Sequence, residues 1–229
     1  MEDTGEKCID LRSLMILYVN GDSNSAGAEI IKDYCFAGDD PTLSDTDRSP
    51  HPEAIPKTYG AKLAKYLNAT LVLDAESASS NARILRTTRN FLENTKAKPF
   101  IVIGWTTWDR EEWPYKEEWL QITSSGTDSV PNELKKKYKQ WVIDQTPAEV
   151  KTKRLYWTNL INQFSNELSQ QDIKHLFFHI DEYTNYLTKQ GFKTVNNGYH
   201  FGEDGHNAWY NFLLERLTST QEHSTIKTN

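Results

Sequence analysis

Two segments at opposite ends of the chain carry residue types that suit nucleophilic catalysis. The segment NGDSNSAG (20–27) follows an apolar run, and glycine permits a sharp turn that would leave Ser23 at the end of a strand. The segment NGYHFGEDGH (197–206) precedes an amphipathic pattern near the other end of the chain. A catalytic serine needs a neighbouring base and donors for the developing oxyanion. His200 could supply the base toward the Ser23 hydroxyl.

Each signal is weak by itself. Gly-Asp-Ser occurs in many ordinary turns, and a lone histidine more often caps a helix or lies at the surface. Position is what favours catalysis here. Ser23 follows the first apolar run, and His200 stands in a turn just before the last amphipathic segment.

Strands and helices must position these residues, and the apolar pattern predicts both. Near-continuous apolar runs suit a parallel sheet that is covered on both faces. The runs are Leu14–Val19, Thr70–Leu73, Phe100–Ile103 and His175–Ile180. Helical periodicity occurs in the segments Tyr59–Leu67, Asn81–Leu92, Leu155–Leu168 and His206–Leu217. Strands that alternate with helices predict a doubly wound α/β sheet.

Two insertions interrupt this alternation. Residues 38–56 are rich in Asp, Ser and Pro, and residues 106–145 hold a Trp-rich segment and a charged helix around Glu133–Trp141. Both follow predicted strands and should emerge at the carboxyl edge of the sheet, where open α/β sheets bind ligands. Within the second insertion, residues 107–113 suit either a ligand wall or a helix start. The tail, residues 218–229, is polar and is expected to fray.

Composition narrows the function classes. A chain of 229 residues that is 37% hydrophobic can form one substantial core, so we expect a single domain over residues 1–229. A net charge of −6 and scattered basic residues argue against a nucleic-acid partner. No apolar run approaches the roughly 20 residues that cross a bilayer, and the run at 14–19 is too short for a secretory signal. Cys8 and Cys35 form no disulfide framework, so a cytoplasmic location is expected. The oligomeric state stays open.

The two catalytic segments form part of a longer resemblance. In chain order, residues 20–27, 75–84, 101–106 and 197–209 resemble the sequence blocks of the SGNH (GDSL-type) hydrolase family, over about Leu14 to Leu217. The resemblance implies a flavodoxin-like three-layer sandwich with a central, mostly parallel sheet of about four to five strands. It also implies ester hydrolysis through an activated serine, with no metal or organic cofactor.

The resemblance assigns roles to particular residues. Ser23 matches the nucleophile, and its N–H group would donate to the oxyanion. Ala78 stands where the family has a glycine that donates a second N–H group. Thr106 stands where the family has an asparagine donor, and Asn81 is a possible substitute. His200 matches the base, whereas His206 matches the opening of the last helix and has a structural role.

Asn197 is the largest departure from the family pattern. It stands where the family has the aspartate that orients the histidine, and an amide brings no charge to stabilise an imidazolium. An Asp→Asn change of this kind costs serine proteases about 10⁴ in kcat. Three interpretations remain: a Ser–His dyad, a carboxylate from elsewhere (Asp181 and Glu182 first), or a domain in which catalysis is weak or lost.

The substrate prediction is an O-acyl (acetyl) ester of a carbohydrate, or another small-molecule or glycan ester. It rests on the resemblance and on the aromatic residues of the second insertion, because aromatic faces pack on sugar rings. Candidate substrate contacts are Asp22, Trp105 and Trp108. The alternatives are a catalytically impaired glycan-binding or structural module, and transfer of the acyl group to an acceptor other than water. His175 and His179 lie four residues apart in an apolar strand and are interpreted as strand residues rather than metal ligands.

Overall fold

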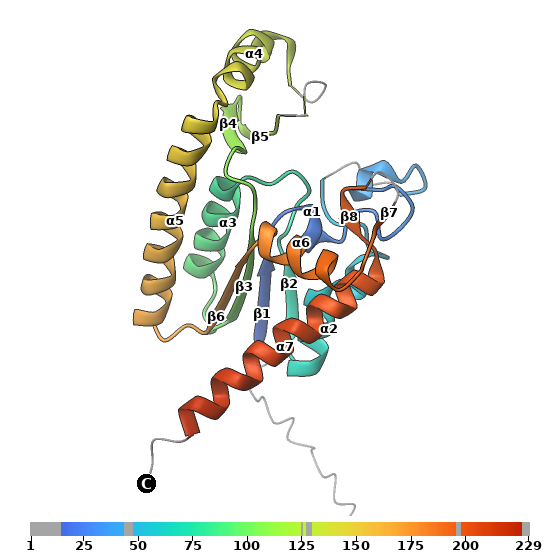
Figure 1. Cartoon of the computed structure of the whole chain (residues 1–229), viewed down its shortest axis with the longest axis vertical. Helices are drawn as coiled ribbons and strands as arrows, with labels where there is room; N and C mark the ends of the chain where they lie inside the picture. Colours follow the sequence, from blue (N-terminus) through green and yellow to red (C-terminus); the bar gives the residue numbers. More distant parts are fainter. Residues whose placement is uncertain (1–14, 44–47, 125, 127–129, 196–197, 226–229) are drawn as a thin grey trace, which may run out of the picture.

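The computed structural model describes residues 15–43, 48–124, 126, 130–195 and 198–225, with side chains up to residue 219. Its centre is a parallel sheet with the strand order β2-β1-β3-β6 (Figure 1). The strands are β1 (Ile16–Asn20), β2 (Thr70–Leu73), β3 (Phe100–Trp105) and β6 (His175–His179). This order begins as in flavodoxin-like doubly wound sheets, so the predicted fold class is confirmed.

Helices cover both faces of the sheet because side chains of a strand alternate between them. On one face, α2 (Tyr59–Leu67), α6 (Ile180–Lys189) and α7 (Glu203–Thr225) pack on Leu17 and Val19 of β1. On the other face, α3 (Asn81–Asn94) and α5 (Pro147–Gln170) pack on Tyr18. Three layers result, with two apolar cores.

Local sequence sets the starts of these helices. The Thr58 side chain accepts from Ala61 N at the start of α2, and the Ser80 side chain accepts from Arg83 N at the start of α3. Thr146 caps α5 in the same way, directly before a proline in the first turn. Such caps satisfy N–H groups that have no partner within the helix.

The second insertion folds as a small separate cluster. Strands β4 (Glu111–Tyr115) and β5 (Glu118–Ile122) form an antiparallel hairpin, followed by η4 (Asn132–Leu134) and α4 (Lys135–Asp144). Trp113 and Trp141 are buried between them, and the cluster lies at one end of the molecule (Figure 1). The predicted charged helix is confirmed. Of the two interpretations of residues 107–113, the helix start is excluded, because a strand begins at Glu111.

Other elements were not predicted from the sequence. They are α1 (Ser23–Ala26), α6, the short strands β7 (Thr194–Val195) and β8 (His200–Phe201), and the turns η1 (Ala37–Asp39) and η2 (Ile55–Lys57). The helix α7 continues into the polar tail as far as Thr225, and the predicted fraying of this tail stays a prediction.

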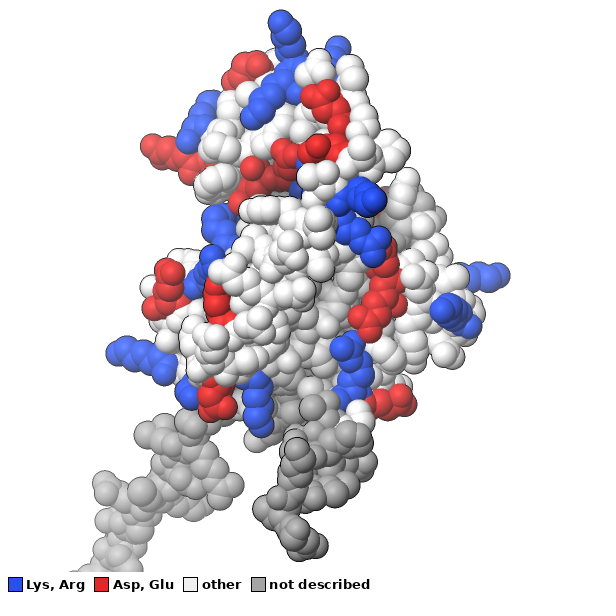
Figure 2. Space-filling model, turned by 60° about the vertical axis from the view of Figure 1, so that its left-hand side comes forward, with Lys and Arg blue, Asp and Glu red and all other residues white. Residues whose placement is uncertain are grey.

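The surface carries charge of both signs. Figure 2 shows Lys and Arg side chains interspersed with Asp and Glu over the face that it draws. No helix within the described residues is long and apolar enough to cross a membrane.

Candidate active site

Ser23 lies where β1 leaves the sheet. Gly21 makes the turn, and a Cβ atom there would lie 2.2 Å from Ser25 Oγ. Asp22 caps α1, with Oδ1 accepting from Asn24 N at 3.0 Å. Ser23 is the first residue of α1 and is 5% exposed, and none of the hydrogen bonds between described residues uses its hydroxyl. Its N–H group belongs to the first helical turn, where N–H groups have no helical partner.

The turn is anchored to the rest of the fold by side chains that the sequence analysis missed. Asn20 Oδ1 accepts from Gly21 N at 2.8 Å, and its amide donates to the Ile84 carbonyl of α3 at 3.2 Å. Tyr59 of α2 donates its hydroxyl to Ser25 Oγ at 2.7 Å. The nucleophile turn is therefore held from both helical layers.

Asp22 is buried and contacts two other segments of the chain. Its Oδ2 accepts from Thr106 Oγ1 at 2.7 Å and lies 3.2 Å from an Arg110 guanidinium nitrogen. Arg110 also donates to the Ser79 carbonyl at 3.3 Å. Both carboxylate oxygens of Asp22 thus contact groups of the protein, which gives Asp22 a positioning role; its predicted contact with substrate stays a prediction.

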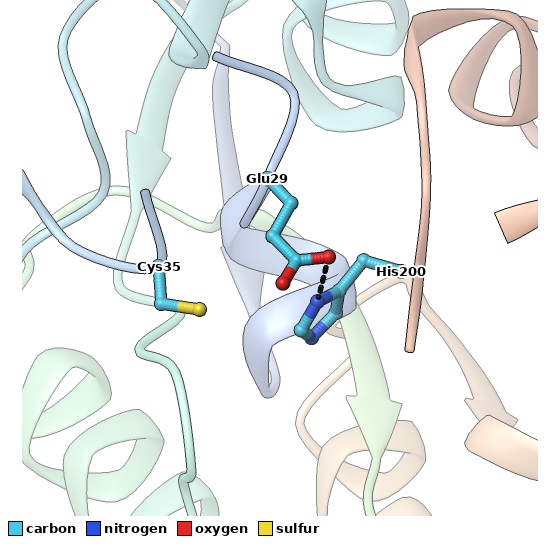
Figure 3. Close-up of side chains that lie close together, drawn as sticks. All are labelled: Glu29, Cys35 and His200. Atoms are coloured by element: carbon cyan, nitrogen blue, oxygen red, sulfur yellow. Dashed lines mark ion pairs between the residues drawn. The ribbon is translucent and has the colours of Figure 1, made fainter. Parts of the chain in front are cut away.

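His200 pairs with a carboxylate that the sequence did not predict. His200 lies on β8, which packs against α1. Its Nδ1 atom lies 3.1 Å from Glu29 Oε2 (Figure 3). The side chains are 12% and 2% exposed, respectively. A carboxylate beside Nδ1 stabilises the imidazolium that forms when Nε2 takes a proton.

Glu29 therefore replaces the carboxylates that were the first candidates. Asp181 Oδ2 faces His179 Nδ1 at 3.2 Å, and Glu182 pairs with Arg216 at 2.8 Å. Neither ion pair includes His200, so both candidates are wrong. Asn197 lies outside the described residues.

No spacing pattern points to Glu29. It follows α1 in a loop, in a left-handed conformation (φ 61°), and its N–H group donates to the Tyr34 carbonyl at 2.7 Å. A left-handed conformation is uncommon for a residue with a Cβ atom. Only the fold brings this loop to β8, so sequence reasoning could not find the pair.

Cys35 also lies beside His200 (Figure 3). Burial, together with the negative charge of Glu29, Asp39 and Asp33, raises the pKa of the Cys35 thiol to about 11. The thiolate is the nucleophilic form of cysteine. Cys35 is therefore a poor nucleophile near neutral pH, which leaves Ser23 as the candidate.

The predicted oxyanion donors have contrasting surroundings. Ala78 adopts φ 65°, a left-handed conformation that favours glycine, and its N–H group donates to no other described residue. The Thr106 hydroxyl donates to Asp22. The Asn81 amide donates to the carbonyls of Thr106 at 3.2 Å and Thr107 at 3.5 Å. The backbone donors are thus free of described partners, whereas both side-chain donors are engaged.

The two tryptophans that were predicted to contact the substrate differ in their burial. Trp105 is 3% exposed and packs edge-on against Phe177 in the core, so its assignment as a substrate contact is not supported. Trp108 is half-buried and stacks on the His179 ring, with centroids 4.1 Å apart. Burial lowers the pKa of His179, so its neutral form is favoured beneath the indole.

The remaining histidines have structural partners. His206 is buried, its Nδ1 accepts from Tyr59 N at 3.3 Å, and burial lowers its pKa to about 3. Its predicted structural role is confirmed. His175 contacts Ser165 Oγ at 2.7 Å, away from His179, whose Nδ1 accepts from Asp181 N.

These observations define an α/β protein whose carboxyl sheet edge gathers a serine, a histidine and a buried glutamate. No family model matches the chain, and no curated protein matches it. Two similar solved structures are esterases. One is the psychrotrophic esterase EstA from Pseudoalteromonas sp., inhibited by monoethylphosphonate, with 9% identity and a TM-score of 0.42 over 90% of this chain and 98% of that chain.

The other is a carbohydrate esterase described as having an active site with divergent catalytic and non-catalytic binding functions. Its identity is 17% and its TM-score 0.43, over 90% of this chain and 65% of that chain. At these TM-scores neither likeness carries weight for the chemistry of this chain.

Proposed function

We propose that this protein is a serine ester hydrolase, a divergent relative of the SGNH family, with Ser23, His200 and Glu29 as its catalytic triad. The observation that carries the proposal is the buried contact between His200 Nδ1 and Glu29 Oε2, on a strand that packs against the helix of Ser23. A histidine held in this way has its other nitrogen available as a base.

The reaction would run in two halves. Ser23 Oγ attacks the acyl carbon while His200 Nε2 takes the hydroxyl proton, and Glu29 stabilises the imidazolium. His200 then gives that proton to the departing alkoxide, which leaves as the alcohol and an acyl-serine. Water, deprotonated by His200, attacks the acyl-serine and releases the acid and free Ser23.

Backbone donors would hold the oxyanion. The N–H groups of Ser23 and Ala78 donate to no described side chain, and preorganised donors of this kind contribute strongly to catalysis. For Thr106 or Asn81 to join them, its side chain would have to leave its present partner. The left-handed Ala78 keeps the N–H direction that a glycine would give.

The proposed substrate is an O-acetyl ester of a carbohydrate or a similar small ester. Trp108, which is only half-buried, supports this class, because an indole packs well on a sugar ring. The chemistry as written needs no metal or organic cofactor.

Hydrolysis of p-nitrophenyl acetate and of acetylated oligosaccharides tests the proposal. Ser23→Ala and His200→Ala should each lower kcat/KM at least 10³-fold, with the urea midpoint retained. Ser165→Ala is the matched control, because Ser165 also contacts a histidine but lies on α5. Equal rates for Ser23→Ala and wild type would refute the assignment.

A second candidate, a catalytically impaired glycan-binding module, is favoured by one observation. Both side chains proposed as oxyanion donors are engaged by other groups, Thr106 by Asp22 and Asn81 by backbone carbonyls. A binding module predicts that Ser23→Ala leaves glycan affinity unchanged while Trp108→Ala abolishes it. Hydrolysis by the wild type that Ser23→Ala abolishes would exclude this candidate.

A further inference from the structure

Three side chains of different chemistry converge beside the proposed triad. Glu29, Cys35 and His200 each offer one ligand atom, and these atoms all lie within 4.8 Å of one another (Figure 3). Glu29 is buried, whereas Cys35 and His200 are partly exposed. The proposed hydrolysis uses two of these residues and leaves Cys35 without a role.

The spacing suits a tetrahedral divalent ion. Zn²⁺ binds sulfur at about 2.3 Å and nitrogen or oxygen at about 2.0–2.2 Å, which sets ligand atoms roughly 3.3–3.8 Å apart. The Nδ1–Oε2 separation is already 3.1 Å. Closing the widest pair by about 1 Å would complete three protein ligands. A water molecule would complete the tetrahedron in the fourth position.

The loop that carries two of these ligands is fixed by hydrogen bonds. Glu29 N donates to the Tyr34 carbonyl at 2.7 Å, which holds Glu29 close to Cys35. Cys35 N donates to Asp39 Oδ2 at 2.7 Å, and the Cys35 carbonyl accepts from Ser77 Oγ at 2.7 Å. Such outer contacts orient metal ligands and strengthen binding.

The ligand types select the ion. Thiolate and imidazole favour Zn²⁺ over Mg²⁺ or Ca²⁺, which prefer oxygen ligands. We propose that Glu29, Cys35 and His200 form a Zn²⁺ site, and that the bound ion inhibits the hydrolase. On binding, the thiol proton of Cys35 passes to solvent and the sulfur bonds to the metal.

Inhibition follows from the position of the imidazole proton, and this part rests on the proposed function. Zn²⁺ bound at Nδ1 displaces the Glu29 contact and requires the ring proton to sit on Nε2. A protonated Nε2 cannot accept the Ser23 proton. The same ion also takes the carboxylate that would stabilise the imidazolium.

Direct binding tests the site without any measurement of activity. Chelator-treated protein is titrated with Co²⁺ and then with Zn²⁺ in competition with a chromophoric chelator. We expect one equivalent to bind with a thiolate-to-Co²⁺ charge-transfer band. Cys35→Ser should lose the band and weaken Zn²⁺ binding at least 10-fold, whereas Cys8→Ser, which changes the other cysteine of the chain, should keep both. No band in the wild type, or its loss only in Cys8→Ser, would overturn the site.

Rates with and without one equivalent of Zn²⁺ test the inhibition. The wild-type rate should fall at least 10-fold with Zn²⁺. For Cys35→Ser, the ratio of the rate with Zn²⁺ to the rate without it should stay near one at the same concentration. Equal ratios in both proteins would overturn the inhibitory role while leaving the Co²⁺ result to decide the site. If metal-free wild type hydrolyses no ester, the proposed function and the inhibitory role both fail, and the Co²⁺ spectrum still decides whether the site exists.

Discussion

Replacing Glu29 by glutamine tests the most specific feature of the proposed triad. The substitution keeps the size of the side chain and removes its charge. His200 Nδ1 and Glu29 Oε2 are 3.1 Å apart, and both side chains are nearly buried. With an effective dielectric constant of about 20, two unit charges at this distance attract each other by about 5 kcal/mol.

That attraction acts fully only in the transition state, when His200 is an imidazolium, so its loss should raise the barrier. Each 1.36 kcal/mol is a tenfold change in rate, and the amide dipole keeps part of the attraction. We therefore expect Glu29→Gln to lower kcat by about 10³-fold, with KM within about threefold of the wild type because the substrate does not contact Glu29.

The assay is p-nitrophenyl acetate hydrolysis, with the urea midpoint as the check on folding. Glu182→Gln is the matched control, because Glu182 is a partly exposed glutamate that pairs with Arg216 and not with His200. Its rate should stay within about twofold of the wild type. A folded Glu29→Gln protein that retains a third or more of the wild-type kcat would refute the reasoning.

Three further predictions concern the structure around the site. Ala78→Gly should raise the free energy of unfolding by about 0.5–1 kcal/mol in urea titrations, because glycine relieves the left-handed strain at φ 65°; a loss of stability would contradict this. Gly104→Ala should lower it by about 1–3 kcal/mol, because the added Cβ would lie 2.8 Å from Ser25 Oγ and from the Phe178 ring; unchanged stability would show that the neighbours move aside freely. His206 has a folded pKa of about 3, below its ordinary 6.5, so protonation favours the unfolded chain and stability falls as the pH drops below about 6.5. Between pH 7 and pH 5, protonation of His206 should lower the free energy of unfolding of the wild type by about 2 kcal/mol. Over the same interval the free energy of unfolding of His206→Asn should fall by about 2 kcal/mol less than that of the wild type. Equal losses in both proteins would contradict the prediction.

The central sheet could be predicted because its strands are short apolar runs separated by amphipathic segments. The bounds of β2 and α2 match the predicted ranges, and those of β1 differ by two residues at the start and one at the end. The helix α6 was missed, although Ile180, Tyr183 and Leu187 have helical spacing, because it follows β6 with no loop between them. The hairpin of β4 and β5 was missed because Pro114 lies inside a strand, where proline is unfavourable except at an edge.

The site was predictable only in part. Ser23 and His200 stand in short motifs whose order along the chain is informative, and the structural role of His206 followed from its place at the last helix. Glu29 and Cys35 could not be found, because a loop after α1 meets β8 only when the sheet edge is assembled. Trp105 lies at the end of a central strand, where its indole packs in the core, and sequence alone does not distinguish such a side chain from one that faces a ligand.

The most direct test of the central claim is intact-mass analysis after treatment with a fluorophosphonate, which forms a covalent bond with an activated serine. The account predicts a single adduct on the wild-type chain, none on Ser23→Ala, and a much slower reaction for Glu29→Gln. A wild-type chain that stays unlabelled while a known serine esterase reacts alongside, or an adduct that persists in Ser23→Ala, would contradict it.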